Sequence, residues 1–276
     1  YDKLILCTGG HPRLPDLPGI DGRHVHTLRT VDDAQRLRAA LISEPRVLVI
    51  GGGWIGLELA AAARVANCQV TLVEAGSKLC ARTNSPALSA WLAHLHTERG
   101  VALRMETCVS KLEDRGADGC RAQFADGSSA VFDLVVVGIG LVQNDALARA
   151  AGLECDRGVV VDRQCRTADP AIFAAGDVTA VRCPEGGLMR LESWQNAQDQ
   201  AIAAARAALG QVVDYQPIPY FWSEQYQSMV QIAGACAASG TPLIRGTSLE
   251  RFMAVELDAN GRILFAVNTG TPRDFR

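Results

Sequence analysis

The chain has 276 residues, of which 48% are apolar, enough for about two domains with cores of their own. The formal net charge is −3, with no lysine or arginine run longer than a pair, so nucleic-acid binding is not indicated. Apolar runs such as residues 47–50 have the length of a strand, far below the roughly 20 residues of a membrane span. No signal peptide is visible. We therefore expect a cytoplasmic protein that binds neither nucleic acid nor membrane.

The first 44 residues predict one part of a domain. They begin with a strand over residues 3–7 and continue through a Gly/Pro-rich loop, Gly9 to Gly22. A helix is expected over residues 32–41, with Thr30 as its N-cap, because a hydroxyl there can accept a hydrogen bond from the first helical turn. Since the chain begins directly with a buried strand, we expect it to start inside a domain.

Residues 46–140 predict a nucleotide-binding βαβ unit. An uninterrupted apolar strand over residues 46–50 is typical of a parallel sheet covered on both faces, and an Ala-rich helix over residues 54–66 follows it. The further elements expected are strands at 69–74, 101–106, 120–124, 129–132 and 134–137, a helix at 88–99 and a hairpin turn at Asp126-Gly127. This alternation of strand and helix indicates a Rossmann-like domain.

Residues 141–276 predict two further regions. The first holds a short helix near 145–151, strands near 159–161 and 172–175, and an Ala-rich helix from about 195 to 209. From residue 218 the sequence becomes aromatic and rich in expected strands, with turns at Asn260-Gly261 and around Gly246. This change of character predicts a separate C-terminal domain.

The strongest local motif is Gly51-Gly-Gly-Trp-Ile-Gly-Leu-Glu58, in which Gly51, Gly53 and Gly56 form a G-x-G-x-x-G pattern between strand and helix. The first glycine permits the tight turn, the second lets the backbone approach a pyrophosphate, and the third lets the helix pack closely on the strand. The helix N-terminus then offers N–H groups to the phosphates. A glycine-rich turn in an unrelated α/β protein is the alternative.

Glu74 lies 18 residues after Gly56, at the end of the next expected strand. A carboxylate there can accept hydrogen bonds from both ribose hydroxyls of an adenosine and would repel a 2′-phosphate. It therefore favours NAD over NADP, although Lys78 and Arg82 nearby weaken that preference.

Two further signals follow in the chain. The buried strand near residues 172–175 ends in Gly176-Asp177, at the edge of a sheet where ligands gather; a simple turn is the alternative. The segment Leu191-Glu-Ser-Trp-Gln-Asn-Ala-Gln198 opens the long Ala-rich helix, whose N-terminus would stabilise developing negative charge on a ligand.

The nine cysteines include no Cys-x-x-Cys pair, and the five histidines are not clustered, so no metal site is expected. Isolated cysteines in an apolar intracellular chain are mostly small core residues. We therefore interpret the nine as small core residues.

Six blocks of the sequence together resemble the FAD-dependent NADH:ferredoxin reductases of bacterial oxygenase systems. They are Tyr1-Asp-Lys-Leu-Ile-Leu-Cys-Thr-Gly9, Gly51-Gly-Gly-Trp-Ile-Gly-Leu-Glu58, Val135-Val-Val-Gly-Ile-Gly140, Ala174-Ala-Gly-Asp-Val178, Glu192-Ser-Trp-Gln-Asn-Ala197 and Tyr220-Phe-Trp-Ser-Glu-Gln-Tyr226. The likeness is strongest to the reductase components of aromatic-ring dioxygenases, and putidaredoxin and rubredoxin reductases are nearby relatives. It covers essentially the whole chain.

The resemblance implies a two-dinucleotide-binding-domain flavoprotein of α/β class, with a Rossmann-like NAD domain inserted in an FAD domain and a small α+β C-terminal domain. The expected segments are 1–44 and 167–218 for the FAD domain, 45–166 for the NAD domain and 219–276 for the C-terminal reductase domain. The family's first glycine motif is absent, and the family has further C-terminal residues, so the chain resembles a protein truncated at both ends.

The resemblance also implies cofactor-binding roles for particular residues. Thr8, Gly9 and Arg13 would lie along the FAD, Asp177 would bond its ribityl chain, Trp194 would place helix N–H groups at its pyrimidine edge, and Trp222 would lie beside its ring system. Gly176, Glu192 and Ser193 complete the expected FAD set. For NAD, Glu58 would reach the nicotinamide carboxamide, and the other expected contacts are Gly51, Gly53, Trp54, Ile55, Gly56, Glu74, Arg82, Gly138 and Gly140.

The implied function is a ferredoxin–NAD(+) reductase that passes electrons from NADH through FAD to a [2Fe-2S] ferredoxin feeding an aromatic-ring-hydroxylating dioxygenase. No catalytic side chain is expected, because hydride passes directly between the cofactors. An acidic ferredoxin would favour a basic rim, to which Arg182, Arg190, Arg245 and Arg273 could contribute. A homodimer is left open.

Three other functions stay open at this point. A disulfide reductase of the thioredoxin-reductase type would carry Cys-x-x-Cys in the NAD domain, and the glutathione-reductase type would carry a C-terminal His-Glu pair; neither pattern is present. An NADH oxidase or peroxidase would give the electrons to oxygen or peroxide. A non-catalytic NAD-binding or signalling flavoprotein would keep the fold without turnover, against which Glu58 and Trp222 argue only weakly.

Overall fold

The structure is a computed structural model, and it describes all residues except 185, 235–241, 247–250, 271 and 276. The chain forms two compact units. The first unit comprises residues 1–11 and 141–221, and the second comprises residues 12–140 and 222–276. Each unit is therefore assembled from two separate stretches of the chain.

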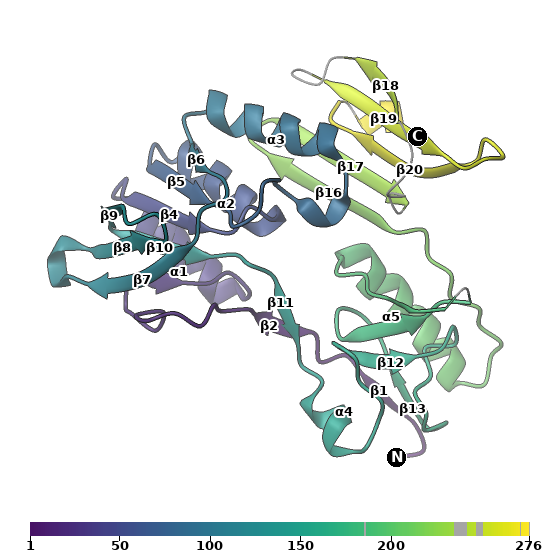
Figure 1. Cartoon of the computed structure of the whole chain (residues 1–276). Coiled ribbons are helices and arrows are strands. Elements are labelled where there is room, and N and C mark those ends of the chain that lie inside the picture. Colours follow the sequence, from purple (N-terminus) through teal and green to yellow (C-terminus); the bar gives the residue numbers. More distant parts are fainter. Residues whose placement is uncertain (185, 235–241, 247–250, 271, 276) are drawn as a thin grey trace. The chain divides into compact units, whose positions relative to one another are not determined.

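The second unit is built on a five-stranded parallel sheet with strand order β3-β10-β4-β5-β6 (Figure 1). Its strands are β3 (Val25–His26), β4 (Arg46–Ile50), β5 (Gln69–Val73), β6 (Ala102–Arg104) and β10 (Leu134–Val137). The helices α1 (Val31–Leu41), α2 (Trp54–Val65) and α3 (Pro86–Glu98) connect successive strands. Parallel strands require such crossovers, so the sequence order of strand and helix dictates this layer.

The two faces of the parallel sheet are covered by different elements. Successive side chains of β4 point to opposite faces and therefore join different cores. Val47 and Val49 join the core formed with the helices. Leu48 and Ile50 face the antiparallel sheet of β7 (Val109–Asp114), β8 (Cys120–Phe124) and β9 (Ser129–Phe132). All four side chains are buried, which explains why residues 47–50 of β4 are all apolar. The 3₁₀ segments η1 (Ala81–Thr83) and η2 (Gly116–Asp118) lie in the connections.

The C-terminal stretch forms a five-stranded sheet with order β16-β17-β20-β19-β18 (Figure 1). Its elements are β16 (Tyr220–Gln225), β17 (Ser228–Gly234), β18 (Leu243–Gly246), β19 (Phe252–Leu257), β20 (Ile263–Asn268) and η3 (Pro272–Phe275). One face contributes Val230, Ile232, Phe252, Phe265 and Val267 to the same core as the helices of the Rossmann layer. This shared core makes the sheet part of the second unit.

The first unit contains shorter pairings around one long helix. Its strands are β1 (Leu4–Leu6), β2 (Gly10–Pro12), β11 (Leu141–Gln143), β12 (Val159–Val161), β13 (Ile172–Ala174), β14 (Thr179–Arg182) and β15 (Leu188–Met189), and its helices are α4 (Ala146–Ala150) and α5 (Trp194–Ala208). β1 pairs in parallel with β13, and β12, β14 and β15 form a second sheet. Ala203, Ala204 and Ala207 pack α5 against Phe173 of β13, because small side chains let helix and strand approach closely.

The structure confirms the expected fold class, since a Rossmann-like unit interrupts a domain made of two flanking segments. The divisions by contact fall at residues 11/12, 140/141 and 221/222, whereas the sequence placed them at 44/45, 166/167 and 218/219. Residues 12–44 group with the Rossmann layer because β3 pairs with β10. No helix in the described part of the chain has the length and apolar content needed to cross a membrane.

Helix α1 begins with the N-cap that the sequence predicts. The hydroxyl of Thr30 accepts a hydrogen bond from the Asp33 N–H (3.1 Å), and the Asp33 carboxylate accepts one from the Thr30 N–H (2.8 Å). The hydrogen bond from the Thr30 backbone is the main reason why the pKa of Asp33 falls to about 2. This reciprocal pair is a capping box.

We expect Asp33→Ala to lower the free energy of unfolding by about 1 kcal/mol at neutral pH, because it removes half of this box. The depressed pKa sets the sign of the pH effect. The contribution of Asp33 is present above its unfolded pKa of about 4 and is lost as the pH falls towards about 2. The free energies of unfolding of wild type and variant should therefore become equal as the pH falls through that range, which urea unfolding measures. Asp32→Ala, in the same turn but outside the box, is the control, and equal losses for both variants would contradict the account.

Candidate functional site

The glycine loop after β4 lies where the parallel strands end. Gly51 has φ +110°, a conformation that side chains other than glycine rarely adopt, and its N–H donates to the carbonyl of Val73 (2.8 Å). A Cβ at this position would lie 2.6 Å from the carbonyl oxygen of Gly138. Glycine at position 51 is therefore required by the turn itself.

The other two glycines of the motif differ in the space that the protein leaves for a side chain. A Cβ on Gly56 would lie 2.0 Å from the Gly51 carbonyl oxygen, so only glycine lets α2 pack this close to the strand end. At Gly53, the N-cap of α2, the nearest heavy atom to a Cβ would be 3.9 Å away. The protein itself would accommodate a side chain at position 53. No cap side chain takes up the first N–H groups of α2, so the turn is open to an anion.

The end of β10 borders this loop. A Cβ on Gly138 would lie 3.2 Å from the Gly56 nitrogen. Gly140, with φ +112°, accepts a hydrogen bond from the Arg13 N–H (2.9 Å), and a Cβ there would meet the Arg82 guanidinium at 3.4 Å. The structure thus brings the two expected glycines of β10 and Arg82 to the edge that holds the G-x-G-x-x-G turn.

The carboxylate of Glu74 ties two loops together. One oxygen accepts the N–H of Gly52 and the other the N–H of Gly76, each at 2.7 Å. These bonds fix the carboxylate beside the glycine loop, directly after β5. Each oxygen has a second lone pair, so the expected contact with ribose hydroxyls stays a prediction, while the bracing of Gly52 is a role that the sequence did not reveal.

Glu58 lies one turn into α2, the helix that follows the glycine loop. It is half-buried, and the Ser223 hydroxyl donates to one of its oxygens at 2.6 Å. Burial raises the pKa of Glu58, the Ser223 hydrogen bond opposes that rise, and the nearby Glu224 carboxylate adds to it. Of its expected neighbours on α2, Trp54 is half-buried and Ile55 is exposed.

Thr8 and Gly9 follow β1 in the first unit and are held by one residue, Asn144, through its side chain and its backbone. The Asn144 amide donates to the Thr8 carbonyl (2.9 Å), the Thr8 hydroxyl donates to the Asn144 carbonyl (2.7 Å), and the Asn144 N–H donates to the Gly9 carbonyl (2.9 Å). This clamp fixes the strand end that carries two of the expected FAD contacts. Sequence reasoning missed Asn144, because a lone asparagine in a loop has no spacing that marks it.

The turn after β13 is held by a residue far away in the sequence. Gly176 has φ +82°, and its N–H donates to Gln200 Oε1 (2.8 Å) on α5. The Thr179 hydroxyl lies 3.0 Å from the same oxygen, and Gln200 is fully buried. Asp177, half-buried, follows at the turn. Gln200 was also missed, although a glutamine among alanines, one turn after Asn196, is a signal for a buried polar contact.

The N-terminus of α5 carries three further expected FAD residues. The Ser193 hydroxyl accepts the Asn196 N–H at 3.2 Å and so acts as the helix cap. Trp194 opens the helix with 66% of its surface exposed. Glu192 accepts a hydrogen bond from the Gln143 amide at 3.1 Å. A Cβ on Gly176 would be 3.6 Å from the Ala197 Cβ, so the Gly-Asp turn and this helix end lie together. Arg13 and Trp222 belong to the second unit.

The interpretation of the cysteines as core residues is wrong for two of them, and Cys155 and Cys183 are only half-buried. Cys68, Cys80, Cys120 and Cys165 are buried, and burial raises the pKa of each thiol. Cys7 and Cys108 are exposed, because the first directly follows β1 at a strand end and the second lies in the connection before β7. Cys236 lies outside the described residues. The cysteines described are free thiols.

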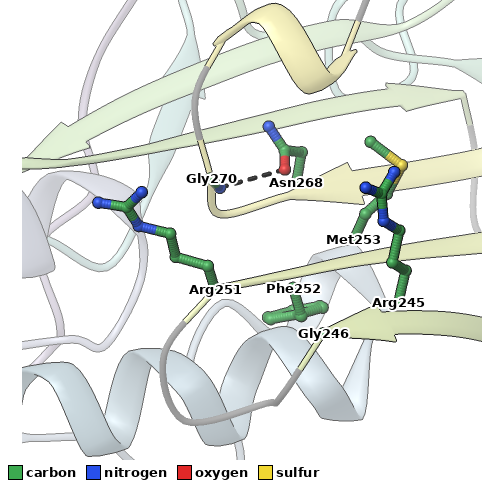
Figure 2. A pocket seen from close by; sticks show the side chains of 7 residues that line it. All are labelled: Arg245, Gly246, Arg251, Phe252, Met253, Asn268 and Gly270. Carbon is green, nitrogen blue, oxygen red and sulfur yellow. Dashed lines mark hydrogen bonds between the residues drawn. The ribbon is translucent and has the colours of Figure 1, made fainter.

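A shallow pocket lies on the C-terminal sheet (Figure 2). It is lined by Arg245, Gly246, Arg251, Phe252, Met253, Asn268 and Gly270. The Gly270 N–H donates to the Asn268 carboxamide oxygen at 3.1 Å, and both arginines are exposed. Arg245 is one of the four arginines expected to form a basic rim, whereas Arg182 forms an ion pair with Glu154.

Comparisons with known proteins agree with this geometry. Residues 1–201 match the family described as pyridine nucleotide-disulphide oxidoreductase, and residues 220–276 match the reductase C-terminal family. Rhodocoxin reductase of Rhodococcus erythropolis is 42% identical, over 99% of this chain and 64% of the relative. The ferredoxin–NAD(+) reductase component of the anthranilate 1,2-dioxygenase system of Burkholderia cepacia is 41% identical, over 99% and 68%.

Solved structures give the same result. The reductase in the covalent putidaredoxin reductase–putidaredoxin complex superposes with a TM-score of 0.93 at 35% identity, covering 100% of this chain and 67% of that chain. A water-forming NADH oxidase from Lactobacillus brevis has a TM-score of 0.86 at 25% identity, over 97% and 64%. The chain spans about two thirds of the length of these relatives. The resemblance seen in the sequence is confirmed: the chain belongs to the pyridine nucleotide-disulphide oxidoreductase family and carries its reductase C-terminal domain.

Proposed function

We propose that the full-length protein is an FAD-dependent ferredoxin–NAD(+) reductase that passes electrons from NADH to a [2Fe-2S] ferredoxin, which feeds an aromatic-ring-hydroxylating dioxygenase. The observation that carries the proposal is the glycine loop, in which the protein itself excludes a side chain at Gly51 and Gly56 but not at Gly53. Similarity to reductase components of anthranilate, benzene and p-cumate dioxygenase systems supports the choice of partner and pathway class.

The residues of the second unit fit a bound NAD. The open turn at Gly53 and the uncapped N-terminus of α2 would receive the pyrophosphate. Glu74, braced by Gly52 and Gly76, would accept the adenosine ribose hydroxyls. Gly138, Gly140 and Arg82 would border the nucleotide, with Trp54 and Ile55 beside it, and Glu58 would accept the carboxamide N–H of the nicotinamide.

The residues of the first unit fit part of an FAD site. Thr8, Gly9, Gly176 and Asp177 all follow the carboxyl ends of the paired strands β1 and β13, the edge where such sheets bind ligands. Glu192, Ser193 and Trp194 lie at the start of α5, the helix whose Ala197 contacts Gly176. For Arg13 and Trp222, the FAD contacts that the family resemblance implies stay predictions.

A flavin held there would accept a hydride from NADH and release electrons singly to an iron–sulfur partner. The chain supplies orientation and electrostatics for this chemistry, and we assign no side chain as a proton donor or acceptor. The first N–H groups of α5 and its dipole would stabilise negative charge on a bound ring. Glu58 would hold the nicotinamide in one orientation, which lowers the entropic cost of hydride transfer.

The partner surface and compartment complete the proposal. The exposed arginines Arg245, Arg251 and Arg273 would attract an acidic ferredoxin, and the cytoplasm is the proposed compartment. The segments 1–44 and 167–218 for FAD, 45–166 for NAD and 219–276 for the C-terminal domain are kept as functional assignments. A homodimer stays an open prediction.

We expect the purified full-length protein to reduce cytochrome c with NADH only when an acidic [2Fe-2S] ferredoxin is added. The reason is that electrons leave the site through a bound partner and not through oxygen. A control without ferredoxin measures direct transfer, and oxygen uptake is recorded in parallel. Rapid NADH-dependent oxygen consumption without ferredoxin would favour an NADH oxidase, the alternative suggested by the Lactobacillus brevis structure.

A further inference from the structure

A continuous chain of hydrogen bonds runs from Glu58 into the interior of the second unit. The Ser223 hydroxyl donates to Glu58 Oε1 (2.6 Å), and the Gln225 amide donates to Ser223 Oγ (3.1 Å). Gln225 Oε1 lies 2.8 Å from His96 Nε2, and the Tyr226 hydroxyl lies 3.2 Å from His96 Nδ1. Three elements far apart in sequence meet here: α2, α3 and β16 with its turn.

The donors of this chain all point towards Glu58. Because the Gln225 amide donates to Ser223, its oxygen must accept from His96, which places the ring proton on Nε2. His96 Nδ1 is then an acceptor for the Tyr226 hydroxyl. The neutral histidine suits its place, since His96 is fully buried and burial lowers its pKa. Aligned donors polarise one another and strengthen the last bond, which ends on a carboxylate.

The members of the chain are not surface contacts. Ser223 and Gln225 are each 1% exposed and lie two residues apart, so they share one face of β16. A buried donor or acceptor that loses its partner costs free energy, so the chain is kept intact as a unit. Tyr226 ends it, with the Arg99 guanidinium over its ring at 5.2 Å.

We propose that Ser223, Gln225, His96 and Tyr226, which we call the Glu58 relay, are positioning residues that present the Glu58 carboxylate to the carboxamide of NADH. This inference rests on the proposed function. Ser223 donates to Oε1 and fixes the carboxylate plane, so that Oε2 faces the carboxamide in one orientation. The C-terminal sheet thereby becomes part of the NAD site, although it contributes no glycine motif.

The relay predicts a particular specificity. An amide N–H on the nicotinamide ring can donate to Oε2, whereas the methyl ketone of 3-acetylpyridine adenine dinucleotide cannot. A hydrogen bond to a positioned, half-buried carboxylate gives about a tenfold preference for the amide. A carboxylate without Ser223 would be free to rotate and would retain only a small part of that preference.

The experiment compares the affinities of NAD⁺ and its acetylpyridine analogue for the full-length protein by titration calorimetry. We expect about a tenfold preference for NAD⁺ in wild type and little preference in Ser223→Ala. In Tyr226→Phe, which keeps the packing, the preference should fall by a smaller factor, about two- to threefold. Ser85→Ala is the matched control, because Ser85 is a buried serine that caps α3 but lies outside the relay. It should keep the wild-type preference despite reduced stability.

The outcomes separate this inference from the function on which it rests. If wild type binds neither dinucleotide, the proposed function fails. If wild type prefers NAD⁺ and Glu58→Ala abolishes that preference, but Ser223→Ala and Tyr226→Phe match Ser85→Ala, the relay is refuted and the function stands. Should Ser223→Ala not fold, Tyr226→Phe decides alone: an unchanged preference contradicts the relay.

Discussion

Gly53→Ala is expected to weaken NADH binding at least tenfold while lowering the free energy of unfolding by no more than about 1 kcal/mol. The added methyl would have 3.9 Å to the nearest protein atom, so the fold has room for it. A pyrophosphate bound at the N-terminus of α2 would collide with the methyl, because it has to approach the backbone at this residue. The small stability cost reflects the poorer capping by alanine.

Gly56→Ala provides the contrast. Its methyl would be forced to 2.0 Å from the Gly51 carbonyl oxygen, so helix and strand must separate, and we expect a loss of about 2–4 kcal/mol in stability together with the loss of binding. Titration of NADH and urea unfolding of the full-length variants measure both quantities. Equal destabilisation by the two variants, or normal NADH binding by Gly53→Ala, would contradict a phosphate site at this turn.

Gln200→Leu is expected to destabilise the first unit by about 2–4 kcal/mol and to release FAD from the full-length protein. The substitution removes the acceptor of the Gly176 N–H, and a buried donor without a partner is costly. The Thr179 hydroxyl keeps the Gly176 carbonyl as its acceptor. With the turn no longer held, Asp177 loses its fixed position beside α5. The flavin retained after gel filtration and the unfolding midpoint measure the two effects.

Gln198→Leu is the matched control for this variant, because it makes the same change at an exposed position of the same helix. We expect it to keep both stability and FAD. Gln200→Glu retains an oxygen in place and replaces a nitrogen that donates to no described residue, so it should lose less FAD than Gln200→Leu. Full flavin retention by the leucine variant would show that Gln200 does not hold the site.

Much of the fold could be predicted from pattern alone. The sequence places the buried strands at residues 46–50 and 134–137 correctly to the residue, because a strand covered on both faces is apolar throughout. The strand β7 was missed, since only Leu112 among its six residues is buried and the others resemble a polar loop. The contacts group residues 12–44 with the Rossmann layer, which sequence pattern alone did not indicate, because the pairing of β3 with β10 joins segments about a hundred residues apart.

The glycines and carboxylates of the candidate site were predicted from the sequence, but the side chains that hold them in place were not. The spacing of the glycines indicates the turn from the sequence alone. Gly51 and Gly56 are required there by the close approaches that any βαβ turn makes. The side chains that hold the site in place follow no such spacing. Gln200 acts on Gly176 across 24 residues, and His96 meets Gln225 across 129 residues. Such contacts depend on tertiary packing, so local spacing cannot identify the partner, although a glutamine among alanines does indicate a buried polar contact.

The most direct test of the central claim is an anaerobic titration of the full-length, FAD-loaded protein with NADH, followed by the visible absorbance of the flavin. The account predicts that NADH bleaches this absorbance stoichiometrically in wild type, and that Gly53→Ala, still folded and still carrying FAD, requires a much higher NADH concentration. An unchanged flavin spectrum in wild type at saturating NADH would contradict it, because the nucleotide would then have no route from the glycine loop to the flavin.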